Sequence, residues 1–96
     1  MKTYGEIIEL ALEKGYRPRA GKSTALRQNY NEEDVLIRLT SIQKWLRDEQ
    51  GIECWIEPKY EWKILSRAVF KRSEKEYTSY ESAFSEGIYE SLKLIK

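Results

Sequence analysis

The sequence has no histidine and a single cysteine, Cys54, among its 96 residues. Without histidine the chain cannot form Ser–His or Cys–His nucleophile pairs, and it lacks the ligand common to most zinc sites. A lone cysteine cannot form an internal disulfide, which favours a reducing compartment. Cys54 lies in an alternating apolar pattern, so we expect it to be a small buried residue. We therefore expect no catalytic centre, no metal site and no cofactor.

The chain also lacks a long hydrophobic run and an excess of charge of either sign. Its 17 basic and 16 acidic residues leave a formal net charge of +1. This balance excludes a strongly acidic mimic of DNA and a globally basic, non-specific nucleic-acid binder. No stretch approaches the roughly 18 apolar residues of a membrane-spanning helix. Because Glu6 comes too early for a signal peptide, we expect a cytoplasmic location and no membrane partner.

The composition is that of one small globular domain. Hydrophobic residues make up 41% of the chain and charged residues 34%. This is too apolar for intrinsic disorder, and a chain of this length falls within the usual range for one domain. We therefore expect residues 1–96 to form a single domain with one core.

Helical periodicity is clear in three segments, which span about residues 4–14, 32–49 and 79–95. Thr3 and Glu6 have the spacing of a capping box before the first segment, and Thr78 and Glu81 repeat that spacing before the last. Asn31 is the candidate N-cap of the middle segment. We therefore predict three helices with these starting points.

The last predicted helix has a glycine, Gly87, in the middle of its apolar stripe. Glycine at such a position costs about 1 kcal/mol relative to alanine. A close approach between this helix and a sheet would account for its presence, and so would a chance polymorphism.

Two segments between the second and third helices are predicted strands. Residues 52–57 alternate, with Ile52, Cys54 and Ile56 on one face and Glu53, Trp55 and Glu57 on the other. A second strand is expected over residues 62–70, with Trp62, Ile64, Ala68 and Phe70 on one face. The short gap between the two segments favours an antiparallel hairpin, and a short third strand is a further expectation near Tyr77. The predicted fold is α+β, with three helices packed on a small antiparallel sheet in the order α-α-β-β-α.

A basic loop over residues 16–30 is the first candidate site. It has no acidic residue, and its basic side chains are Arg17, Arg19, Lys22 and Arg27. Such residues can bind phosphate groups, and the flanking Tyr16 and Tyr30 could stack on bases. Gly21-Lys22-Ser23 is similar to the end of a phosphate-binding P-loop, but the glycine spacing is wrong and the segment follows a helix. The alternative is an ordinary solvated loop whose charges pair with acidic residues elsewhere.

The second candidate site is the strand face that carries Trp55 between Glu53 and Glu57. If helices cover only one face of the sheet, this tryptophan is exposed, and exposed tryptophans often mark a surface that binds a partner. The alternative is that the first helix or the basic loop covers Trp55.

Two stretches of the chain resemble a set of small uncharacterised proteins carried by phages and mobile elements of gut Bacteroidales. They are Lys44-Trp45-Leu46-Arg47 with the strand that follows it, to Ile56, and the final helical segment over residues 77–95. The resemblance covers about residues 35–96. It implies an αββα core and an origin in a phage or mobile element, and it implies no activity.

The sequence favours a non-enzymatic binding module that acts on a protein partner. The alternative is a protein that binds nucleic acid or a phosphate ligand through the basic loop. Because a short hairpin leaves unpaired strand edges, a homodimer is a further hypothesis.

Overall fold

The computed structural model describes residues 3–17, 32–67 and 69–95. In the helix that begins at residue 32, it describes the side chains from residue 35 onward. Its elements are α1 (Tyr4–Glu13), α3 (Glu32–Gln50), β1 (Ile52–Glu57), β2 (Glu61–Ser66), β3 (Val69–Arg72) and α4 (Tyr80–Lys93). The predicted α+β fold is confirmed. Its sheet has a third strand in addition to the two strands of the predicted hairpin. The predicted N-cap Asn31 lies outside the described residues.

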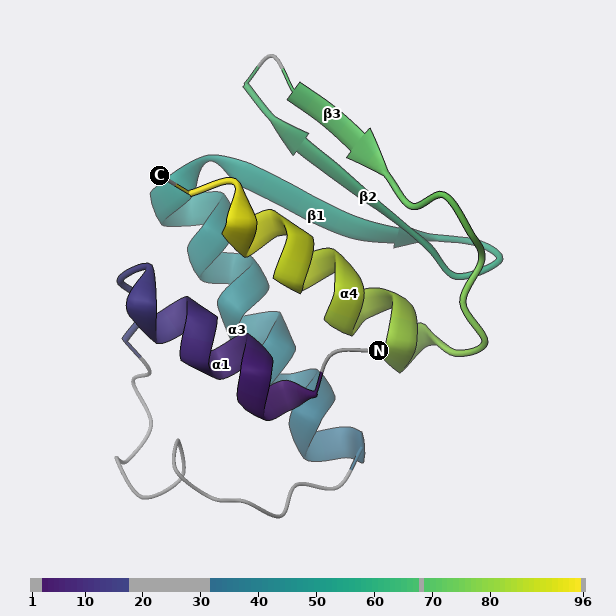
Figure 1. Cartoon of the computed structure of the whole chain (residues 1–96), viewed down its shortest axis with the longest axis horizontal. Helices are drawn as coiled ribbons and strands as arrows, with labels where there is room; N and C mark the ends of the chain where they lie inside the picture. Colours follow the sequence, from purple (N-terminus) through teal and green to yellow (C-terminus); the bar gives the residue numbers. More distant parts are fainter. Residues whose placement is uncertain (1–2, 18–31, 68, 96) are drawn as a thin grey trace.

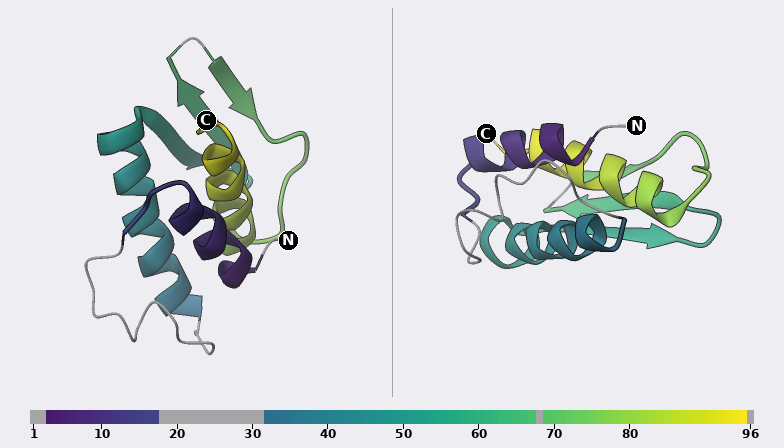
Figure 2. Two further views of the ribbon diagram at one scale, coloured as in Figure 1. Left: turned by 60° about the vertical axis from the view of Figure 1, so that its left-hand side comes forward. Right: turned by 90° about the horizontal axis from the view of Figure 1, so that it is seen from below.

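The sheet is antiparallel throughout, with the strand order β1-β2-β3. Helix α4 packs on β1 and β2, α3 packs on β1 and α4, and α1 packs on α4. Figure 1 shows α4 running along nearly the same direction as β2, with α1 alongside α4. In the right-hand view of Figure 2, α1 and α4 form one layer, while α3 lies beside the strands in the other. The described helices therefore cover one face of the sheet and the edge formed by β1.

The helix ends follow local side-chain chemistry. Thr3 accepts a hydrogen bond from the N–H of Glu6 at 3.2 Å, and the Glu6 carboxylate accepts one from the N–H of Thr3 at 3.3 Å, so the capping box is confirmed. The prediction for α4 was wrong by one residue. Its N-cap is Ser79, which accepts from the N–H of Ser82 at 3.1 Å. A serine hydroxyl caps a helix as well as a threonine hydroxyl does, so the sequence did not discriminate between them.

The predicted strand over residues 62–70 is two strands joined by a tight turn. Arg67 has φ 47°, which reverses the chain between β2 and β3. The reversal brings Phe70 opposite Leu65, away from the face of Trp62 and Ile64. The predicted placement of Phe70 on that inner face is therefore wrong, because the prediction assumed uninterrupted alternation.

The predicted third strand near Tyr77 is also wrong, since the third strand lies earlier, at Val69–Arg72. Tyr77 instead belongs to the connection between β3 and α4. Its N–H donates to the carbonyl of Tyr60 at 3.1 Å, and its hydroxyl accepts from the indole N–H of Trp62 at 3.3 Å. These two bonds tie the connection to the β1–β2 hairpin.

One hydrophobic core lies between the sheet and the helices. Its fully buried members come from every helix and from β1 and β2, and they include Ile7, Leu39, Ile42, Leu46, Cys54, Ile64, Phe84, Ile88 and Leu92. The helix-facing residues of the strands, Ile52, Cys54, Trp62 and Ile64, are all buried. The predicted alternation of residues 52–57 is therefore confirmed.

Gly87 is the point of closest approach between α4 and the sheet. A Cβ atom built on Gly87 would lie 2.8 Å from Cβ of Trp62 and 3.0 Å from Sγ of Cys54. Distances this short are incompatible with van der Waals contact, and the atom at 2.8 Å cannot be moved by a side-chain rotation. Of the two explanations that the sequence left open for Gly87, the structure shows the close helix–sheet approach.

We expect Gly87→Ala to lower the free energy of unfolding by up to about 2 kcal/mol, because an overpacking cost of about 1–3 kcal/mol outweighs the gain of about 1 kcal/mol in helix propensity. Gly5→Ala is the matched control, since a Cβ there would meet only Oγ1 of Thr3, at 3.8 Å. Denaturant unfolding of both variants makes the comparison. A Gly87→Ala variant at least as stable as the wild type would contradict the packing described.

Candidate interaction surface

The face of the sheet turned away from α4, which we call the open face, combines aromatic, aliphatic and charged side chains. Residues opposite each other in an antiparallel pair have their side chains on the same face. In this register Trp55 lies opposite Lys63, which lies opposite Arg72, and in the next row Glu53, Leu65 and Phe70 are neighbours. The open face therefore consists of Glu53, Trp55, Glu57, Glu61, Lys63, Leu65, Phe70 and Arg72.

Apolar side chains at the centre of this face are exposed to solvent. Leu65 is 46% exposed and Phe70 is 55% exposed. Trp55 is half-buried, and its ring centroid lies 6.4 Å from that of Phe70 at an interplanar angle of 55°. Helix α1 packs on α4, on the other side of the sheet, so the alternative in which the first helix covers Trp55 is wrong. The basic loop lies largely outside the described residues and gives no test of that part of the alternative.

A polar chain fixes the orientation of the Trp55 indole. Its Nε1–H donates to Oε1 of Glu57 at 3.0 Å, and the same oxygen pairs with Nζ of Lys63 at 3.4 Å. The hydrogen bond from Trp55, followed by the contact with Lys63, lowers the pKa of the Glu57 carboxyl. These contacts hold the indole ring against the sheet.

Side chains of both charges border the apolar centre of the open face. Glu53 and Glu57 lie on β1, Glu61 and Lys63 lie on β2, and Arg72 lies on β3. Because Lys63 pairs with Glu57, the acidic groups lie toward β1 and Arg72 leaves a positive charge on β3.

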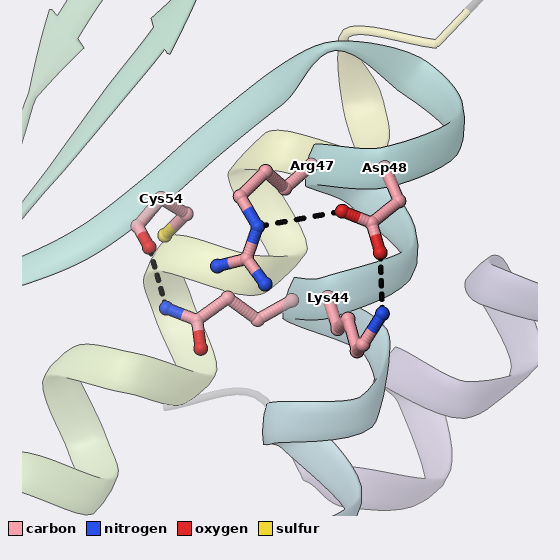
Figure 3. Close-up of polar contacts among 5 residues, drawn as sticks. Lys44, Arg47, Asp48 and Cys54 are labelled. Atoms are coloured by element: carbon pink, nitrogen blue, oxygen red, sulfur yellow. Dashed lines mark hydrogen bonds and ion pairs between the residues drawn. The ribbon is translucent and has the colours of Figure 1, made fainter.

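The β1 edge of the sheet is closed by α3. Nε2 of Gln43 donates to the carbonyl oxygen of Cys54 at 2.6 Å, which satisfies a backbone acceptor on the outer side of the strand (Figure 3). Figure 3 also shows the ion pairs of Lys44 and Arg47 with Asp48 on the same helix. The pKa of Asp48 is lowered mainly by its hydrogen bond with Lys44 and further by Arg47. Because both pairs are exposed, they add little to the stability of the fold.

Tyr16 and Arg17, the first residues of the predicted basic loop, make contacts within the fold. Nη1 of Arg17 donates to the carbonyl oxygens of Leu12 at 2.9 Å and Tyr16 at 2.8 Å, at the end of α1. Tyr16 is buried, and its ring packs edge-on against Trp45 with centroids 5.5 Å apart. Burial raises the pKa of Tyr16. The expectation that Tyr16 stacks on bases is wrong, because its ring belongs to the core.

The other candidate residues of that loop, Arg19, Lys22 and Arg27 with the flanking Tyr30, lie outside the described residues. Binding of nucleic acid or a phosphate ligand through this loop stays a prediction.

Cys54 has the environment of a structural residue. It is 1% exposed, and burial raises the pKa of its thiol to about 12. A thiol with this pKa is protonated at neutral pH and is a poor nucleophile. Within residues 3–17, 32–67 and 69–95, no group of histidine, cysteine and carboxylate side chains could hold a metal ion. None of the helices in the described part of the chain has the length and apolar character needed to cross a membrane.

No family model, curated protein or solved structure matches this chain. The resemblance to phage and mobile-element proteins therefore stays a prediction.

We expect the Cys54 thiol of the folded protein to react with a disulfide reagent at pH 8 at least about a hundredfold more slowly than in denaturant, because both burial and protonation oppose attack. The chain has one thiol, so absorbance of the released chromophore reports this site alone. Equal rates in the folded and denatured protein would show that Cys54 is accessible.

The Trp55–Glu57 hydrogen bond is expected to weaken as the pH falls. Because the hydrogen bond lowers the folded-state pKa of Glu57 below the ordinary value of about 4.5, the bond stabilises the fold above that value and is lost as pH falls through the folded-state pKa. We expect the indole N–H resonance of Trp55 to titrate with a midpoint below pH 4.5, and the transition to disappear in Glu57→Gln. A midpoint at or above 4.5 would contradict the hydrogen bond.

Proposed function

We propose that the chain is a non-enzymatic protein-binding module and that its interaction surface is the open face around Trp55, Leu65 and Phe70. The observation that carries the proposal is the contiguous exposure of Leu65 and Phe70 beside an oriented tryptophan. Exposed apolar groups rimmed by polar residues are typical of protein interfaces, and aromatic residues dominate their binding energy.

The charges around this centre favour a protein over a nucleic acid. A face that binds phosphates needs a basic surface without acidic neighbours, because the affinity comes from neutralising the backbone. Here Glu53, Glu57 and Glu61 border the same aromatic centre as Lys63 and Arg72. Glu57 and Lys63 also pair with each other, which reduces the positive charge available to a phosphate.

The absence of histidine and the buried, protonated thiol of Cys54 support a role in binding over one in catalysis. A cytoplasmic location belongs to the proposal, because a lone unpaired cysteine suits a reducing compartment. An origin in a phage or mobile element, with a partner encoded by the host or the element, rests on the resemblance of about residues 35–96.

Selection from a displayed library of random peptides tests the proposal. We expect peptides selected on the wild-type protein to lose about tenfold or more in affinity for Leu65→Ser and for Phe70→Ser, since each change removes an apolar contact worth roughly 1.4 kcal/mol or more. Ile37→Ser is the matched control. Ile37 is 59% exposed on α3, away from the open face, and its loss should change affinity less than about twofold.

Two outcomes would reject the proposed surface. One is that no peptide is enriched on the wild-type protein. The other is that the selected peptides bind the Leu65 and Phe70 variants as tightly as they bind Ile37→Ser.

A further inference from the structure

Among the described residues, no strand pairs with the outer edge of β3. The N–H of Ser73 donates to the carbonyl of Trp62 at 3.0 Å, which continues the β2–β3 ladder by one residue. Backbone groups alternate in direction along an antiparallel strand, so those of Val69 and Lys71 face β2. Those of Phe70 and Arg72 therefore face outward, and all four residues of β3 are exposed.

The two edge strands of the sheet have different surroundings. At the β1 edge, α3 packs against the strand and Gln43 bonds to the outward carbonyl of Cys54. At the β3 edge, the exposed strand carries Lys71 and Arg72, with Arg67 in the preceding turn. Unpaired backbone groups at an open edge attract further strands, and charges on the edge oppose pairing with strands of like charge while leaving oppositely charged strands as favourable neighbours.

The charge of the β3 edge favours an acidic occupant. In the described part of the chain, Arg67, Lys71 and Arg72 form no ion pair. Lys63, opposite Arg72, is paired with Glu57. Glu74 and Glu76 come later, in the connection that follows β3. The edge therefore presents uncompensated positive charge on both faces of the strand.

A second copy of the chain fits this edge poorly. Antiparallel pairing of two β3 strands centred on Lys71 or on Arg72 would place that residue opposite the same residue of the other copy. Like charges that lie opposite each other across a strand pair are destabilising. An acidic strand would instead form favourable cross-strand pairs with the same residues.

We infer that β3 binds an extended acidic segment of a partner protein as a fourth strand of the sheet. This inference rests on the proposed function and names the chemistry of the partner. Cross-strand neighbours share a face, so two consecutive acidic residues lie beside Arg72 and Lys71 and two consecutive apolar residues lie beside Phe70 and Val69. The added strand extends the open face past Phe70, so the edge and the face form one interface.

The test uses a blocked peptide of about eight residues with the core Asp-Glu-Ile-Val, and a control in which the acidic pair is replaced by Lys-Arg. Addition of the acidic peptide should slow amide hydrogen exchange of Phe70 and Arg72 at least about tenfold, since these N–H groups gain partners. Lys71 is the internal control, because its N–H already faces β2. Affinity should fall about threefold or more between 50 and 300 mM salt, and the basic peptide should not bind.

Two substitutions distinguish the contribution of the Arg72 backbone N–H to binding from that of the Arg72 charge. Arg72→Gln keeps the outward N–H and removes the charge, and we expect it to weaken binding about threefold to fivefold. Arg72→Pro also removes the N–H while sparing the bonds to β2, and we expect a loss of more than about tenfold. Thermal unfolding confirms that both variants fold.

Each alternative result overturns the inference in a recognisable way. Failure of the acidic peptide, while library-selected peptides still depend on Leu65 and Phe70, rejects strand addition and leaves the proposed function in place. If the peptide shifts the resonances of Trp55 but does not slow amide hydrogen exchange of Phe70 and Arg72, the peptide contacts the open face alone. Protection of these two amides without peptide, together with a dimer in sedimentation, identifies a second copy as the occupant.

Discussion

The contact between α4 and the β1–β2 hairpin at Gly87 determines which face of the sheet is covered. With no side chain at this position, the helix backbone comes close enough to bury Cys54 and Trp62 beneath it. Ser91, one turn later, is buried and donates to the carbonyl of Gly87 at 2.8 Å, so no polar group is left unpaired at the contact. Because strand side chains alternate, burial of this set directs Trp55 and Leu65 to the opposite face.

The properties of the open face follow from that division. Trp55 is too large to be left fully solvated without cost, and it is partly covered by Phe70 and held by Glu57. Phe70 reaches it only because the chain reverses at Arg67 and β3 pairs with β2. The third strand is thus what turns a single exposed tryptophan into an apolar surface with a charged border and an open edge.

The parts of the fold that depend on local patterns could be predicted from the sequence, and those that depend on the turn at Arg67 could not. The alternation of residues 52–57 and the helical stripes are periodic over several residues, so they identify their faces directly. The turn between β2 and β3 lacks the glycine or asparagine that usually accompanies a positive φ, so the run from Trp62 to Phe70 reads as one strand. The sequence therefore placed Trp55 on the candidate surface and missed its neighbours Leu65, Phe70 and Arg72.

Both proposals depend on the exposure of Leu65 and Phe70 on an uncovered sheet face. Solvent paramagnetic relaxation by a soluble gadolinium complex measures this exposure for each residue in the folded protein. We expect strong relaxation of the Leu65 methyl and Phe70 ring protons and weak relaxation of the Ile64 methyl protons, which lie one residue away on the buried face. Equal protection of all three side chains would show that both faces of the sheet are covered, and would contradict both proposals.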